Sequence, residues 1–178
     1  MLNKLPIVLK PDIISECWTY YKFAIMQTSE FYPEWLLSHI QLVTYSNGRC
    51  VFGSDDQFYP LSYFNDILDI EDGNLNSVTP SEITTYLKKM IFNGKYIVLD
   101  LNFFKIYNIQ QEGFHLHETL IYGYDDEEEI FFTTLICKEG MVEAKISFKT
   151  IEKAYNDVYQ YYENDVSRFL IVNYNVRI

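Results

Sequence analysis

The most informative ten residues of this chain read His117-Glu118-Thr119-Leu120-Ile121-Tyr122-Gly123-Tyr124-Asp125-Asp126. A histidine opens a short apolar run, which ends in Gly-Tyr-Asp, and a second apolar run begins at Ile130. Two apolar runs separated by turn residues are typical of a β-hairpin. The acidic residues 125–129 are expected to be its solvated turn rather than a cation site. The pattern therefore predicts a hairpin with an imidazole at the start of its first strand.

Outward from this hairpin, the residue periodicity predicts helices first and strands afterwards. The clearest helix start is Thr79-Pro80-Ser81-Glu82, which offers an N-cap, a proline at the first helical position and a capping-box glutamate, and Gly94 ends that helix. Helices followed by an antiparallel sheet are an α+β order, and without a linker or repeat we expect one domain over residues 1–178. Other helices are expected over about 16–27, from Pro33 to before 47, and over about 148–163. Strands are expected over 96–101, 116–122, 130–136, 142–146 and 169–176.

Composition argues against several classes of function. The formal net charge is −11, and no basic stripe is present, so we expect no nucleic acid as a ligand. No run approaches about 18 consecutive apolar residues, so no membrane span is expected. Three cysteines make no disulfide framework, which indicates a cytoplasmic protein with reduced thiols. Because no phosphate loop or dinucleotide motif is present, we expect no cofactor.

Cys17 is the candidate nucleophile. It lies where the first helix should begin, after a possible N-cap at Ser15. Backbone N–H groups and the helix dipole at such a position favour the thiolate, and a neighbouring imidazolium would favour it further. The alternative is that Cys17 is a small buried apolar residue, as we expect for Cys50 and Cys137 in their strand-like runs.

His117 is the candidate base, and Asp100 is the candidate third catalytic residue. If residues 96–101 and 116–122 pair as antiparallel strands, Asp100 falls roughly opposite His117, where a carboxylate would fix the imidazole tautomer. Asn102 is a second candidate on the same argument. His115 is a rival base, because residues two apart on a strand point to the same face. A His-x-His metal site has no further ligand nearby, so no metal is expected.

The combination of Cys17, the capped helix ending in Asn93-Gly94-Lys95-Tyr96-Ile97-Val98, and His-x5-Gly-Tyr-Asp resembles a known family. It is similar to the papain-like bacteriocin-leader (double-glycine) peptidases, and more closely to the N-terminal domain of butirosin biosynthesis protein H and related antibiotic-cluster proteins. The resemblance spans roughly residues 15–155, with Cys17 at the position of the nucleophile and His117 at that of the base. The chain departs from the family in two places. Thr133, Thr134 and Leu135 stand where an Asp is usual, and no Gln precedes Cys17.

The resemblance implies a papain-like fold and a cysteine-dependent acyltransferase. An acyl or peptidyl carrier protein would supply a thioester, a small amine would accept the acyl group, and Cys17 would carry it between them. The carrier protein would dock on a local basic cluster formed by Lys88, Lys89 and Lys95. The alternative is that these lysines form only a solvated face. Two alternatives stay open: a catalytically inactive papain-like binding module, and a thioester or peptide hydrolase.

Overall fold

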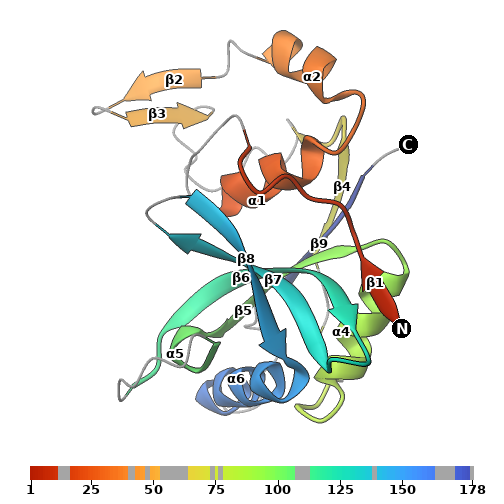
Figure 1. Ribbon diagram of the computed structural model, residues 1–178. Coiled ribbons are helices and arrows are strands. Elements are labelled where there is room, and N and C mark those ends of the chain that lie inside the picture. The colour runs from red at the N-terminus through yellow and green to blue at the C-terminus, as the bar shows by residue number, and fades with distance from the viewer. Residues whose placement is uncertain are drawn as a thin grey trace. The chain divides into compact units, whose positions relative to one another are not determined.

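The structure is a computed structural model of the chain, and its elements form two compact units (Figure 1). The larger unit comprises Met1–Leu5 and Glu71–Tyr174, and the smaller comprises Pro6–Ile70 and Asn175–Ile178. Helices and antiparallel strands both occur, so the expected α+β class is confirmed. Within the described part of the chain, no helix has the length and apolar character needed to cross a membrane. The structure describes residues 1–11, 17–39, 43–46, 49–52, 64–72, 75, 78–106, 113–137, 140–162 and 171–176.

A seven-stranded sheet, most of it in the larger unit, has the order β4-β9-β5-β6-β7-β8, with β1 paired to β6 (Figure 1). The pairings of β1, β5, β7, β8 and β9 with their described neighbours are antiparallel. All five predicted strands are present, whereas β1 and β4 were not predicted. The strands are β1 (Leu2–Lys4), β4 (Leu68–Asp72), β5 (Tyr96–Asn102), β6 (Leu116–Asp125), β7 (Ile130–Cys137), β8 (Gly140–Ser147) and β9 (Ile171–Val176).

The predicted hairpin is β6–β7, but its first strand is longer than expected. Asp125 pairs with Ile130, and the turn between them is acidic, as expected. The interpretation of Gly-Tyr-Asp as part of the turn is wrong, because β6 continues through all three residues. The reason is β1, which pairs with β6 where β5 has ended, so that Lys4 lies opposite Gly123. Lys4 also reaches across the sheet, where its Nζ is 2.6 Å from a carboxylate oxygen of Glu143.

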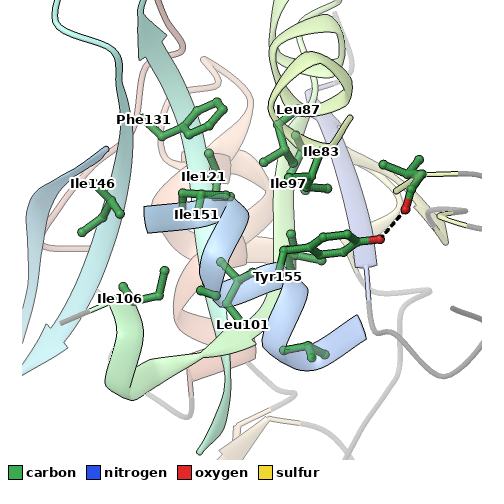
Figure 2. Packing of buried hydrophobic residues seen from close by; sticks show 14 of the residues in the cluster. Ile83, Leu87, Ile97, Leu101, Ile106, Ile121, Phe131, Ile146, Ile151 and Tyr155 are labelled. Atoms are coloured by element: carbon green, nitrogen blue, oxygen red, sulfur yellow. Dashed lines mark hydrogen bonds between the residues drawn. The ribbon is translucent and has the colours of Figure 1, made fainter. Parts of the chain in front are cut away.

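Helices α4 (Ile83–Phe92) and α6 (Phe148–Tyr161) pack against one face of this sheet (Figure 2). The Tyr155 hydroxyl, buried in that core, donates a 3.0 Å hydrogen bond to the Val78 carbonyl. The Glu82 carboxylate accepts from the Thr79 N–H at 3.0 Å, as expected of a capping-box glutamate. The predicted helix start is three residues too early, however, because residues 80–82 form a turn and α4 begins at Ile83 with Glu82 as its N-cap. The core residues include Ile83, Leu87, Ile97, Leu99, Leu101, Ile121, Phe131, Ile146, Ile151, Tyr155 and Val158.

The smaller unit contains α1 (Cys17–Met26), α2 (Tyr32–His39) and a hairpin of β2 (Val43–Ser46) with β3 (Arg49–Phe52). The first helix confirms the prediction closely. The second ends earlier than predicted, because the β-branched and aromatic residues of Val43-Thr44-Tyr45 favour a strand. Four aromatic rings with centroids between 5.7 and 6.4 Å apart hold the unit together: Phe23, Tyr32, Trp35 and Phe64.

The contact between β1 and Gly123 predicts a specific sensitivity to size. A Cβ at position 123 would lie 3.0 Å from the Asn3 carbonyl oxygen and from Lys4 Cα. We expect Gly123→Ala to lower the free energy of unfolding by about 1–3 kcal/mol, measured by urea denaturation. The control is the same substitution in a chain lacking residues 1–4, where the cost should largely disappear. An equal cost in both backgrounds would contradict this explanation.

Candidate functional site

His117 is held at the start of β6 by its own neighbour. Its Nδ1 lies 2.8 Å from the carbonyl oxygen of Glu118. Because a carbonyl oxygen only accepts, Nδ1 carries the proton, and Nε2 of the neutral ring is the unprotonated nitrogen. No described residue hydrogen-bonds Nε2, and the side chain is 30% exposed. An accessible imidazole with this tautomer has the form that a general base requires.

The register of β5 with β6 differs by one residue from the expected one. Asp100 lies opposite Glu118, and Leu101 lies opposite His117. Glu118 places a carboxylate oxygen 3.6 Å from His117 Nδ1, and its side chain is only 16% exposed. Sequence reasoning missed Glu118, which brings a carboxylate to the imidazole from the adjacent position in the strand.

Asp100 and Glu118 form a pair of carboxyl groups across the two strands. Burial is the main cause that raises the pKa of Asp100 to about 7, and the charge of Glu118 raises it further. The charge of the nearby His117 lowers the pKa of Asp100. The charges of Glu118 and His117 both act on Asp100, so the three residues form one electrostatically connected cluster.

Aromatic rings lie beside this cluster. The short helix α5 (Phe103–Ile106) follows β5, and the Phe103 ring centroid is 5.4 Å from that of His117. His115 stacks on Phe104 and lies edge-on to Phe103. The two imidazoles are 6.2 Å apart, so His115 shares the surface with His117. His115 packs on rings, whereas His117 has the oriented Nδ1, and this favours His117 as the base.

Asn102 is fully occupied elsewhere. This nearly buried amide donates to the Asp157 carboxylate at 2.8 Å. Its oxygen faces the backbone N–H groups of Phe104 and His115 at 3.3 and 3.4 Å. The hydrogen bonds tie the end of β5 to α6 and to the start of β6. Asn102 is therefore a structural residue and not the partner of His117, contrary to the alternative drawn from sequence.

Cys17 is the first residue of α1, as expected for a nucleophile at a helix start. It belongs to the smaller unit, whereas His117 and Asp100 belong to the larger one. The proposed N-cap, Ser15, lies outside the described residues. Cys50 and Cys137 lie in β3 and β7, in agreement with their strand-like patterns.

The helix of Cys17 also carries Lys22, a titratable group that sequence reasoning missed. Its side chain is 3% exposed, and its ammonium group lies 4.8 Å from the centre of the Phe64 ring. Burial lowers the pKa of Lys22 to about 8. A lysine inside the apolar run Tyr20-Tyr21-Lys22-Phe23-Ala24 is the signal that would have revealed it.

The basic cluster expected at residues 88–95 is partly neutralised. Lys88 pairs with Asp126, and Lys95 pairs with Glu71. An open surface groove of about 470 Å³ beside α5 and α6 has a mixed lining, with the lysines Lys105 and Lys153 and the carboxylates of Glu152 and Asp157. Lys105 and Lys153 form no ion pair with any described residue. Among the described residues, no group of three or more His, Cys, Asp or Glu side chains is arranged to hold a metal ion.

No protein-family model matches the sequence, and no curated protein matches it either. The case for a function therefore rests on the α+β fold, the His117 cluster and the resemblance carried by the sequence motifs.

The role of Asn102 can be tested by stability. Asn102→Ala leaves the partly buried Asp157 carboxylate and two backbone N–H groups without this partner. We expect the free energy of unfolding to fall by roughly 2–3 kcal/mol, measured by urea denaturation. Asn156→Ala, one position from Asp157 on α6, should change it by less than about 0.5 kcal/mol. Equal effects of the two substitutions would argue against the assigned role.

Asp100 should make stability depend on pH. Its pKa is about 7 in the folded protein against an ordinary value of 3.8, so between these values the folded state binds more protons than the unfolded state. The free energy of unfolding therefore falls as pH rises from about 4 to about 7.

Asp100→Asn, which is neutral throughout, should stabilise the protein at pH 8 by an amount on the order of 4 kcal/mol at most, and hardly at all at pH 4. Urea denaturation at both pH values measures the difference. Glu127→Gln, in the exposed hairpin turn, is the matched control and should show no such dependence. A gain from Asp100→Asn that is equal at both pH values would contradict the assignment.

Proposed function

We propose that this chain is a papain-like cysteine acyltransferase that moves an acyl group from a carrier-protein thioester to an amine. The observation that carries the proposal is the His117 imidazole, which is anchored through Nδ1, flanked by the Glu118 carboxylate and accessible to a substrate. Cys17 at the start of α1 supplies the nucleophile, as the family resemblance implies. The order of elements, with a cysteine-bearing helix before an antiparallel sheet, supports the papain-like form of the α+β fold.

The reaction proceeds in two transfers. His117 Nε2 takes the proton of Cys17, and the thiolate sulfur attacks the carbonyl carbon of the thioester. The carbon–sulfur bond to the carrier breaks, and the carrier leaves as a thiol after receiving the proton. In the second transfer the amine attacks the acyl-cysteine, Nε2 accepts an amine proton, and the cysteine sulfur leaves. The products are an amide, the free carrier thiol and the regenerated Cys17.

The surroundings of His117 favour an acyl substrate. Phe103, Phe104 and His115 present ring surfaces next to the imidazole. Such surfaces bind an apolar acyl chain and keep water away from an acyl-enzyme, which favours amide formation over hydrolysis. Lys105 follows Phe104 directly on α5, and with Lys153 it offers basic groups to an acidic carrier protein.

The first experiment measures alkylation of each thiol by iodoacetamide against pH, using mass spectrometry. We expect Cys17 at pH 7 to react at least about tenfold faster than an unperturbed thiol, and His117→Ala to abolish the advantage. Cys50→Ala and Cys137→Ala are the matched controls and should leave the fast site intact. If Cys17 proves unreactive, the proposal that the chain is an enzyme fails, and the binding-module alternative replaces it.

The second experiment supplies acyl thioesters of N-acetylcysteamine with and without a primary amine. Amide formation should require the amine, and His117→Ala should slow it by about 10²-fold or more. Cys17→Ala should abolish it. Release of a free acid at the same rate with and without amine would identify a hydrolase instead.

A further inference from the structure

The carboxyl group that serves His117 can be assigned from the strand register. In an antiparallel pair, residues directly opposite each other project from the same face of the sheet, so Asp100 and Glu118 face each other. Glu118 then reaches back along its own strand, where its Oε2 is 3.6 Å from His117 Nδ1. The same imidazole nitrogen is bonded to the Glu118 carbonyl at 2.8 Å. One residue thus contacts Nδ1 with both its backbone and its side chain.

Two carboxylates facing each other in a half-buried place repel strongly, and a shared proton relieves that repulsion. Burial is the largest cause that keeps Asp100 protonated up to a pKa of about 7. A protonated Asp100 is a hydrogen-bond donor, and the carboxyl opposite it is Glu118. The carboxylate oxygen near the imidazole belongs to Glu118, whose Oε2 lies 3.6 Å from His117 Nδ1.

We propose that Glu118 is the positioning residue of His117 and that Asp100 acts only through Glu118, as the neutral acid that shares a proton with it. This assignment rests on the proposed function, because His117 is taken as the base. Glu118 would hold the ring in the tautomer that leaves Nε2 free and would stabilise the imidazolium formed when Nε2 takes the thiol proton. The pair of carboxyl groups replaces the single carboxylate that sequence reasoning placed at Asp100.

Glu118 and His117 are the two charged groups that act on the pKa of Asp100 within the described part of the chain. On β6 the other titratable neighbour is His115, whose ring packs on Phe103 and Phe104. On α5, Phe103 and Phe104 are uncharged and Lys105 is exposed. On the far side of β5, Leu99 pairs with Ile171 of β9.

The experiment compares the pH profile of Cys17 alkylation in wild type, Glu118→Gln, Glu118→Asp and Asp100→Asn, with circular dichroism to confirm folding. Loss of a charge partner changes a protonation equilibrium by about one pKa unit, so Glu118→Gln should slow alkylation at pH 7 roughly tenfold. Glu118→Asp, which keeps the charge, should recover part of the rate. Asp100→Asn should stay within about twofold of wild type, because its amide donates the hydrogen bond that the acid donated. Glu127→Gln is the matched control.

A second readout needs no activity. Carbon-13 NMR of the Asp100 carboxyl should show its pKa falling below about 7 in Glu118→Gln, because the charge of Glu118 is one of the causes that raise it. If wild-type Cys17 is unreactive, the proposed function fails, and the titration still decides whether the carboxyl pair exists. If Cys17 is reactive but Asp100→Asn slows it as much as Glu118→Gln does, Asp100 is the direct partner and the assignment is overturned. If Glu118→Gln leaves the pKa of Asp100 unchanged, the assignment of the carboxyl pair is also overturned.

Discussion

The pairing of β5 with β6 is the interaction on which both the core and the site of the larger unit depend. Its register points Ile97, Leu99 and Leu101 into the core beneath α4 and α6. The alternate position on β5 is Asp100, which the same register sets opposite Glu118. Because strand side chains alternate between faces, a slip of one residue would turn Asp100 into the core and take the leucines out of it. The apolar packing that stabilises the sheet therefore also fixes the relative positions of the carboxyl pair and the imidazole.

Much of the fold followed from local signals. The alternation in residues 130–136 and the stop at Gly94 each act over a few positions, and each was predicted correctly. The end of β6 was not, because Gly123 to Asp125 look like a turn until β1 is paired beside them. Likewise, β2 and β3 lie in a stretch where helical and strand preferences compete. A distant partner decided the end of β6, whereas β2 and β3 pair with each other as a local hairpin.

The candidate site, like the fold, was predictable from the sequence only where the signal was local. His117 stood out because an imidazole before an apolar strand is conspicuous. The bond from its Nδ1 to the Glu118 carbonyl, which favours it over His115, could not be predicted from the sequence. Glu118 escaped notice because neighbours on a strand normally project to opposite faces, so its approach to His117 depends on a side-chain conformation. Asn102 was misjudged because its partner, Asp157, is on a helix 55 positions away.

The position of β1 has a consequence for the order in which the sheet forms. Leu2 is far along the chain from its partner in the sheet, Asp125. Contacts between residues so distant in sequence close a long loop, which is slow compared with forming a hairpin such as β6–β7. The edge of β6 beyond Ile121 therefore stays unpaired on one side until β1 joins it. During that interval the folding protein exposes a strand edge able to pair with another chain, which makes this short strand a safeguard against aggregation.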